Sequence, residues 1–502
     1  GAIDANRIDG GAGVRFLTET VTSPTMIAQF RQIAAELPNS RWIQYEPVNE
    51  DNATAGARMA FGSPVHTVYR FDQADRILSL DADIFSKFNV RYTKDYIKRR
   101  NYTEQQTNLN RLYVVESTLT ITGAKADHRL AVKPSQVTEI AKAVAAAVGV
   151  AGAAPSGLSA EAMQWVTVMA RDLQGSRGRT IVVPGDTQPP IVHALAHAIN
   201  GALGNVGQTV VYTEPLSPFT ERTQIEQLRE LIADIDAGRV KTLVILGGNP
   251  VYNTPSDLKL NEQRMKNIPL CIHLSDYFDE TSQFCHWHIP QKHFLEMWGD
   301  ARAYDGTVSI TQPLINPLYG SKSAHELLQI FMRENYDMSD LNIVKQFWQS
   351  QGLSGGAAAV KPAATAPSTP AGTNMTQTAP VNASQSVNQS APATTTANQN
   401  QTAPAATTGN QTAPNTAQVN QNQTATGAAS ANFEDNWRKV VHDGFIANSA
   451  LPPRTVSANT AFLAQPMNQP TLAGSLEISI LPDPCVYDGR FANNGWLQEL
   501  PK

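Results

Sequence analysis

The loop Gly247-Gly248-Asn249-Pro250 is the stretch of the sequence whose residue types best suit the binding of a ligand. It follows an apolar run, residues 243–246, with the length and continuity of a parallel strand buried on both faces. Glycines at the carboxyl end of such a strand let the backbone turn tightly, and nucleotide-like ligands of open α/β sheets bind at that edge. An ordinary turn explains two glycines at least as well, so the loop alone leaves both interpretations open.

A second group of candidate ligands combines thiol and imidazole side chains in one short stretch. Its members are Cys271, His273, Cys285, His286, His288 and His293. Cysteine and histidine are common zinc ligands, but the spacing here fits no standard zinc pattern. Two of the residues, Cys271 and His273, also fall within a predicted strand. We therefore predict that this stretch holds no metal.

Two further polar groups admit both a structural and a functional interpretation. His193 and His197 lie four residues apart on a predicted helix among alanines and a leucine, which favours helix packing. A predicted loop carries a dense polar cluster, Asp300, Arg302, Tyr304 and Asp305. For that cluster both interpretations stay open, and we favour buried salt bridges beneath a subunit interface. The sequence contains no nucleophile elbow, phosphate-binding P-loop or metalloprotease helix, so it identifies no catalytic residue.

Composition limits the classes of protein to consider. With 502 residues the chain is long enough for two or three domains, and its formal net charge of -5 argues against a general nucleic-acid binder. The three cysteines are too few for a disulfide framework or a Cys-ligated cluster, and they do not identify the redox compartment. No apolar run is long enough to span a bilayer. Because the chain starts at Gly1 without a leader and stops at Lys502 after an aromatic-rich run, we expect a segment of a longer protein.

Predicted helices and strands alternate along residues 1–353, which is typical of doubly wound, mostly parallel sheets. The predicted strands cover residues 14–17, 41–45, 76–80, 112–115, 180–183, 209–212, 243–246 and 270–274. The predicted helices cover residues 26–37, 53–61, 137–148, 159–173, 189–203, 224–237 and 324–331. A Gly- and Ala-rich stretch at residues 149–155 predicts a division into two α/β units, residues 1–150 and 151–353.

Residues 354–431 differ in kind from the rest. Ala, Thr, Asn, Gln and Pro dominate, aromatic residues are missing, and Lys361 is the one charged residue among them. Such a composition buries too little apolar surface to offset the entropy of ordering, which predicts a disordered insertion. Residues 432–502 then predict the start of a β-rich C-terminal domain, with an alternating strand at 476–481 and Gly/Asn turns at 486–496.

Several long, non-periodic runs resemble the molybdopterin oxidoreductase superfamily. They are ADRILSLDADIF (74–85), YVVESTLTITGAKADHRLAVKPSQ (113–136), GALGNVGQTV (201–210), VILGGNP (244–250) and SDYFDETSQFCHWHIP (275–290). Three others are most similar to the pterin-enzyme-like half of the iron–sulfur subunit of alternative complex III, a bacterial quinol-oxidising respiratory complex. These are LTETVTSP (17–24), LEMWGDARAYDGTVSITQPLINPLYGSKSAHELL (295–328) and GRFANNGWLQELP (489–501). The resemblance covers nearly everything except the low-complexity stretch.

The resemblance implies pterin-binding loops at the strand ends, and the sequence departs from the family pattern at most of them. The altered loops are Leu80-Asp81-Ala82-Asp83, Glu116-Ser117-Thr118 and Pro134-Ser135-Gln136-Val137, in place of Gly-x-Asn-Pro, Asp-Pro-Arg and Pro-Gly-Thr-Asp. Carboxylates would then stand where an anionic pyrophosphate needs donors, and two unit charges about 4 Å apart repel by roughly 1–4 kcal/mol. The loop Gly247–Pro250 alone keeps the family form, as a vestigial pterin loop.

We therefore expect a retained fold that has lost its pterin. Neither the Cys-rich cluster motif nor the molybdenum-ligating residue of the catalytic relatives is recognisable. As the resemblance implies, the segment would be a non-catalytic portion of a respiratory iron–sulfur subunit on the periplasmic side of the bacterial inner membrane. Its expected partners are membrane quinol-oxidising subunits, c-type haem subunits and the ferredoxin-like half of its own chain, which would carry the iron–sulfur clusters downstream; nucleic acid is not expected.

Two alternatives stay open at this point. The first is a catalytic molybdenum or tungsten bis-pterin oxidoreductase; Asp81 and Asp83 argue against it and the Gly247–Pro250 loop argues for it. The second, which we rank lowest, is that the glycine loop binds some other nucleotide.

Overall fold

The computed structural model describes residues 7–86, 89–103, 107–218, 221–353, 421–464, 476–483 and 485–499. Side chains after residue 353 are described from residue 432 onward. The chain forms two compact units, Gly1–Pro362 with Phe433–Lys502, and Ala363–Asn432. All the sheets and sites described below belong to the first unit.

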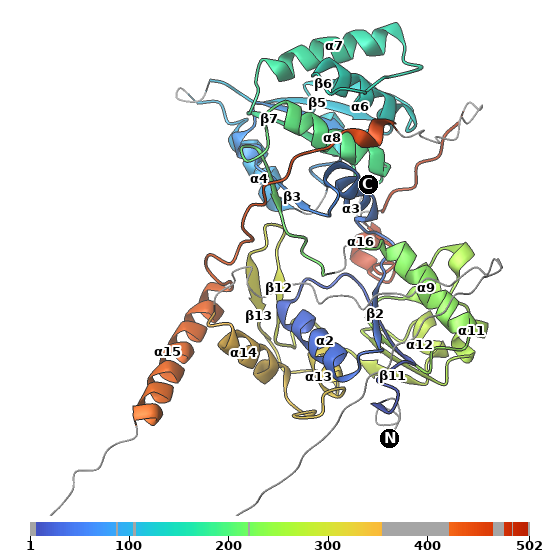
Figure 1. Ribbon diagram of the computed structural model, residues 1–502, viewed down its shortest axis with the longest axis vertical. Helices are drawn as coiled ribbons and strands as arrows, with labels where there is room; N and C mark the ends of the chain where they lie inside the picture. Colours follow the sequence, from blue (N-terminus) through green and yellow to red (C-terminus); the bar gives the residue numbers. More distant parts are fainter. Residues whose placement is uncertain are drawn as a thin grey trace, which may run out of the picture. The chain divides into compact units, whose positions relative to one another are not determined.

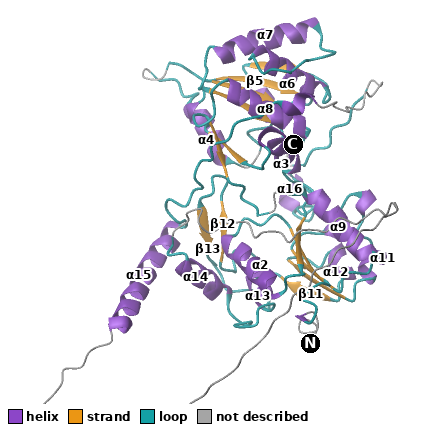
Figure 2. Cartoon of the chain, viewed as in Figure 1, coloured by secondary structure: helices purple, strands orange, loops and turns teal. Residues whose placement is uncertain are grey.

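Strands and helices alternate through the first unit (Figures 1 and 2). The strands are β1 (Val14–Thr18), β2 (Arg41–Gln44), β3 (His66–Tyr69), β4 (Arg76–Leu80), β5 (Arg111–Glu116), β6 (His128–Ala131), β7 (Thr180–Pro184), β8 (Val210–Thr213), β9 (Thr242–Leu246), β10 (Leu270–Ser275), β11 (Trp287–Pro290), β12 (Gly299–Arg302) and β13 (Val308–Thr311). The helices are α2 (Pro24–Glu36), α3 (Asp51–Phe61), α4 (Val90–Lys98), α5 (Ile121–Ala124), α6 (Gln136–Ala147), α7 (Ala160–Gln174), α8 (Pro190–Ala202), α9 (Gln224–Asp236), α10 (Pro250–Asn253), α11 (Glu262–Lys266), α12 (Glu280–Phe284), α13 (Ala324–Gln329), α14 (Asp340–Ser350), α15 (Gln421–Asp443) and α16 (Gly495–Glu499).

Local sequence explains where the longer helices begin. Ser23 has an extended backbone and its hydroxyl accepts a hydrogen bond from the Met26 N–H, while Pro24 occupies the first turn of α2. At α9, Thr223 and Glu226 form a capping box in which each side chain bonds the backbone of the other. Of the two predicted helices, α9 begins at the predicted residue 224, and α2 begins two residues before the predicted residue 26.

A five-stranded parallel sheet has the order β11-β10-β9-β1-β2, and its central strand β9 is buried along its whole length. On β9, Leu243 and Ile245 pack among residues of α9 and α11, while Val244 and Leu246 pack among residues of α2 and α13. Because successive strand residues point to opposite faces, a continuous apolar run such as this one requires cover on both sides. The predicted doubly wound α/β class is confirmed.

A second parallel sheet has four strands in the order β6-β5-β4-β7. Helices α6, α7 and α8 cover one face, as Figure 1 shows, and their apolar residues form one cluster with Leu78 and Leu80 of β4. Ile77 faces the other way, into a cluster that includes Tyr96 of α4 and Tyr212 of β8. Two antiparallel pairs, β3–β8 and β12–β13, are the remaining strand pairs among the described residues.

The two parallel sheets are interleaved in sequence, and this corrects the predicted division at residue 150. β1 and β2 pair with β9 in the five-stranded sheet, whereas β7 joins β4 in the four-stranded sheet. Neighbouring parallel strands need crossover connections and do not have to be consecutive in the chain. The chain therefore starts one sheet, builds the other, and returns to complete the first.

The C-terminal part is helical and irregular over its described residues, not β-rich. The alternation at residues 476–481 predicts a strand, but the described chain has no strand there, and Leu476, Ile478 and Ile480 are exposed. An alternating segment becomes a strand only when another strand lies beside it. Most of the predicted insertion lies outside the described residues, and α15 begins within it, at Gln421. In the part of the chain that is described, no helix is both long and apolar enough to cross a bilayer.

Candidate functional site

The glycine loop has the backbone shape of a ligand-binding turn. Gly247 and Gly248 have φ angles of 70° and 66°, which a residue with a side chain rarely adopts. Asn249 anchors the loop to α12: its side-chain oxygen accepts a 2.7 Å hydrogen bond from the Thr281 hydroxyl, and its amide group donates to Glu280. The position predicted from the sequence, directly after β9, is therefore that of a fixed and well-supported turn.

The space beside this loop is too small for a ligand. The cavity that Gly247–Pro250 line has a volume of about 10 Å³, which is room for about one water molecule. The Glu19 carboxylate lies against the loop, since a Cβ added to Gly247 would lie 3.4 Å from its Oε2 atom. The glycine turn is therefore retained without the opening that a nucleotide needs.

Carboxylates follow three of the four other strands of the five-stranded sheet at the same edge. Glu19 follows β1, Glu46 follows β2, and Asp276 follows β10. Burial, and then the negative charge of Glu19, raise the pKa of Asp276. Burial likewise raises the pKa of Glu46, and Glu19 adds to the effect although the Thr20 hydroxyl opposes it. Like charges near one another and out of water disfavour ionisation, which accounts for both upward pKa shifts.

The C-terminal segment, residues 485–499, supplies the cation at this edge. Arg490 donates hydrogen bonds to Glu19 and, at 2.7 and 2.9 Å, to the two carboxylate oxygens of Asp488. The Asp488 hydrogen bond is the largest of the effects that raise the pKa of Arg490. Gly489 passes so close to Tyr252 that a Cβ there would lie 2.8 Å from the Tyr252 ring. The segment thus lies directly against the carboxyl edge of the five-stranded sheet.

The strand ends of the four-stranded sheet carry the other predicted residues. Asp81, directly after β4, accepts a 3.0 Å hydrogen bond from the Ser117 N–H and a 2.7 Å bond from the Gln188 side chain. Its φ of 60° is unusual for a residue with a side chain. Gly185 after β7 permits this arrangement, because a Cβ there would lie 2.1 Å from the Asp81 carbonyl oxygen.

The carboxylates of Asp83 and Glu116 also accept hydrogen bonds from other residues of the chain. The Asp83 carboxylate accepts hydrogen bonds from the N–H and the hydroxyl of Thr122, at 3.2 and 2.6 Å. The buried Glu116 accepts a 2.7 Å bond from the Thr120 hydroxyl and pairs with Arg129. Gly123 leaves the necessary space, since a Cβ there would lie 1.9 Å from Glu116 Oε1.

The predicted residues therefore form two separate edges, not one site. The structure brings Asp81, Asp83, Glu116 and Ser117 together at the four-stranded sheet, with Thr118 exposed beside them, while Gly247–Pro250 belong to the five-stranded sheet. At the first edge, the N–H groups of Ser117, Thr120 and Thr122 already donate to carboxylates of the chain. An anionic pyrophosphate needs such donors, so the residues at these edges do not fit it.

The cysteine and histidine stretch is part of the support beneath the glycine loop. His273 is fully buried, with Nε2 3.1 Å from the Gly248 carbonyl oxygen and Nδ1 2.9 Å from the Ser282 hydroxyl. Burial lowers the pKa of His273, which favours the neutral ring. Within the described residues, no group of three or more His, Cys, Asp or Glu side chains could hold a metal ion.

The two histidines of α8 and Asp300 of the polar cluster lie in the protein interior. His193 and His197 are buried on α8, and the ring of His197 is 3.0 Å from the Tyr212 hydroxyl. Asp300 is buried but accepts from Ser23, Thr25 and Trp348. The predicted loop is wrong at this point, because Asp300 and Arg302 lie on β12. Small and charged residues alternate along Gly299–Arg302, and this pattern lacks the apolar residues by which a strand is recognised in a sequence.

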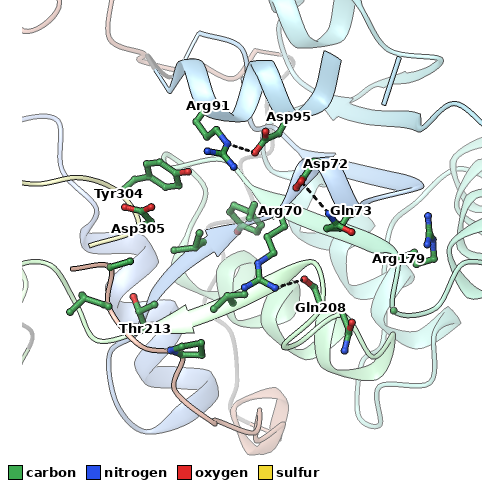
Figure 3. A pocket seen from close by; sticks show the side chains of 17 residues that line it. Arg70, Asp72, Gln73, Arg91, Asp95, Arg179, Gln208, Thr213, Tyr304 and Asp305 are labelled. Atoms are coloured by element: carbon green, nitrogen blue, oxygen red, sulfur yellow. Dashed lines mark hydrogen bonds and ion pairs between the residues drawn. The ribbon is translucent and has the colours of Figure 1, made fainter. Parts of the chain in front are cut away.

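A separate cavity is lined by none of the residues named at these two edges. It has a volume of about 550 Å³ and is lined by residues of β3, β8 and α4 together with Tyr304 and Asp305 (Figure 3). Arg91 pairs with Asp95 at 2.7 Å and Arg179 pairs with Asp75. Figure 3 also shows Arg70 reaching Gln208, whose carbonyl oxygen accepts at 3.4 Å. Carboxylates of the protein thus neutralise Arg91 and Arg179, whereas Arg70 contacts an uncharged carbonyl group.

Sequence reasoning missed the residues that close the five-stranded edge: Glu19, Tyr45, Glu46, Asp276 and Arg490. The three carboxylates each follow a predicted strand directly or within one residue, so the rule applied to the glycine loop would have found them. Arg490 is different, because it lies far along the chain from Glu19 and nothing local indicates the contact.

No protein-family model matches the chain, and no curated protein matches it. Among solved structures, acetylene hydratase from Pelobacter acetylenicus is similar with a TM-score of 0.47 and 13% identity, covering 66% of this chain and 56% of that chain. The formyltransferase/hydrolase complex from Methylorubrum extorquens, in complex with methylofuran, is similar with a TM-score of 0.44 and 12% identity, covering 69% of this chain and 96% of that chain. Both TM-scores are below 0.5, so neither likeness carries an argument about the chemistry of this chain.

Proposed function

We propose that this chain is a non-catalytic, pterin-enzyme-like scaffold within a respiratory quinol-oxidising complex of the alternative complex III type. The resemblance of its sequence to the iron–sulfur subunit of such complexes is the reason for choosing this assembly. In this proposal, the chain holds a downstream iron–sulfur portion against membrane and c-type haem partners, on the periplasmic side of the inner membrane.

One observation carries the non-catalytic part of the proposal. At the carboxyl edge of the four-stranded sheet, the backbone donors that would bind a pyrophosphate donate to Asp81, Asp83 and Glu116 instead. These N–H groups already have carboxylate acceptors within the chain. A cofactor would have to displace the carboxylates, which would leave their negative charges without hydrogen-bond partners. The edge is stable as an internal structure and does not need a ligand to complete it.

The glycine loop favours a second candidate, a catalytic molybdenum or tungsten bis-pterin oxidoreductase. Its two positive φ angles form a tight turn at the carboxyl end of a parallel strand, where nucleotide-like ligands of α/β sheets bind. The cavity of about 10 Å³ beside it argues against this candidate, because the side chain of Glu19 and the segment around Arg490 would both have to move. The scaffold is therefore the proposal that we prefer.

The assembly is tested by isolating the complex through an affinity tag on this chain in its native host. We expect the purified complex to carry c-type haem and non-haem iron and to oxidise a soluble quinol analogue. The matched control is the same tag on an unrelated periplasmic protein of that host. Purification of the intact, full-length chain without haem, iron or quinol oxidation would overturn the proposed assembly.

A further inference from the structure

Two thiols of the five-stranded sheet are in direct contact. Cys271 lies on β10 and is fully buried, and Cys285 directly follows α12 and is partly buried. Their Sγ atoms are 2.7 Å apart. A disulfide bond is about 2.05 Å long, so the sulfurs need to approach by only about 0.7 Å to reach bonding distance.

The backbone holds both residues in this position. The His286 N–H donates a 2.9 Å hydrogen bond to the Cys271 carbonyl oxygen, and the Cys271 N–H donates to His286 Nδ1 at 3.1 Å. The Cys285 N–H donates to the Ser282 carbonyl oxygen at the end of α12. Because the start of the β10–β11 pairing and a helix end position the two thiols, their contact is a property of the sheet and not of a flexible loop.

We propose that Cys271 and Cys285 are a redox pair that forms an intramolecular disulfide. The oxidant is a low-molecular-weight disulfide such as oxidised glutathione. The Cys285 thiolate attacks one sulfur of the oxidant, which breaks its S–S bond, releases one thiol and leaves a mixed disulfide on Cys285. The Cys271 thiolate then attacks Cys285 Sγ and releases the second thiol. The two cysteines lose two protons and two electrons in total, and the oxidant is reduced to two thiols.

Exposure determines the order of the two steps. Cys285 is partly accessible, whereas Cys271 is fully buried and cannot meet an oxidant from solution. The contact with Cys285 and burial also raise the pKa of the Cys271 thiol. Cys271 therefore acts second, on a mixed disulfide that is already beside it.

The bond would stabilise the support of the glycine loop. The loop it closes contains α12, and from α12 Thr281 bonds Asn249 while Ser282 bonds His273 beneath Gly248. Linking Cys285 to β10 ties this helix to the strand that carries His273. A disulfide at this place therefore restrains the edge of the five-stranded sheet, independently of the function proposed above.

Peptide mapping of the full-length protein tests the pair directly. The protein is incubated with oxidised glutathione, denatured, alkylated without reductant and cleaved after glutamate, so that Glu280 separates the two cysteines. We expect a cross-linked pair of peptides that contain Cys271 and Cys285, with Cys485 alkylated in the same sample. Reduction before alkylation should convert the pair into two alkylated peptides.

Alkylation of both Cys271 and Cys285 after oxidation would overturn the proposal, as would a cross-link of either one to Cys485. This test uses the wild-type protein, so its outcome does not depend on whether a variant folds. As a second measurement, oxidation should raise the Tm of the wild type and of Cys485→Ser by a few degrees, roughly 2–6 °C. Cys285→Ser should show no such redox-dependent shift, and an equal shift in that variant would contradict the pairing.

Discussion

At the edge of the four-stranded sheet, single carboxylates accept hydrogen bonds from backbone N–H groups, as a bound phosphate does in a nucleotide site. Asp81 accepts from the Ser117 N–H, and Asp83 accepts from the N–H of Thr122. Backbone N–H groups at such positions carry partial positive charge and are costly to bury without an acceptor. Here the chain itself supplies these acceptors.

Glu116 is the most buried of these acceptors, and its removal should be costly. Glu116→Ala leaves Arg129 without its carboxylate and Thr120 without its acceptor. We expect the free energy of unfolding to fall by about 2–4 kcal/mol, as for other broken buried pairs. Urea unfolding measures this change, with the exposed Glu334→Ala as the matched control, which should change stability by less than about 0.5 kcal/mol. Equal stability of the two variants would disprove the role of Glu116.

His197 should make the stability of the fold depend on pH. Burial, and then the charge of His193, lower the pKa of His197 to about 3 in the folded state, against about 6.5 in an unfolded chain. Between these two values the unfolded state binds an extra proton, so this contribution to stability is complete above pH 6.5 and is lost as the pH falls towards 3. The expected slope is at most about 1.4 kcal/mol per pH unit.

The replacement His197→Gln keeps a polar partner for Tyr212 but removes the titrating group. Unfolding free energies of both proteins between pH 7 and pH 5 measure the difference in slope. We expect the wild type to lose more stability than the variant as the pH falls. Parallel pH profiles would mean that His197 does not carry this dependence.

At the scale of elements, the covering of the five-stranded edge by residues 485–499 depends on Arg490. Arg490→Ala removes the hydrogen bonds to Glu19 and Asp488. We expect amide hydrogen exchange in residues 485–499 to rise at least about 10-fold while exchange in β9 stays unchanged. Arg490→Lys is the matched control; it keeps the charge without the two-pronged contact and should give an intermediate rate. Unchanged exchange in the alanine variant would show that other contacts hold the segment.

Elements with strong local signals are those that the sequence predicts well. Ser23 and Pro24 mark the start of α2, and the apolar run 243–246 marks a strand buried on both faces. The strand predicted at residues 270–274 is also present, as β10, and four of these five residues are apolar. In each case the information lies within a few neighbouring residues, which is the range over which such patterns operate.

Long-range arrangement is what the sequence did not predict. Residues 476–481 alternate as a strand does, but a strand also needs a neighbour, and the pattern carries no information about one. The pairing of β1 with β9, and of Arg490 with Glu19, likewise joins residues far apart in the chain. For the candidate site, the residue types at Asp81, Asp83 and Gly247 were predicted, whereas the separation into two edges on different sheets was not.

At the scale of the whole molecule, residues 363–420 should be dispensable for folding of the first unit. We expect a chain in which a 20-residue Gly/Ser linker replaces them to unfold at a Tm equal to or slightly above that of the wild type. The physical reason is that a shorter connection lowers the entropy cost of loop closure, by about 1 kcal/mol here. Differential scanning calorimetry of both chains measures this. Loss of the cooperative transition in the shortened chain would show that the replaced residues contribute to the core.

The central claim is that the edges of both sheets are closed by the chain's own side chains and leave no place for a pterin. The most direct test is metal and pterin analysis of the intact complex purified from its native host. Inductively coupled plasma mass spectrometry measures molybdenum and tungsten, and oxidative extraction followed by fluorescence measures pterin. We expect iron with neither molybdenum, tungsten nor pterin above background, alongside a known bis-pterin enzyme as the positive control. Either metal near one atom per chain, together with pterin, would contradict the claim.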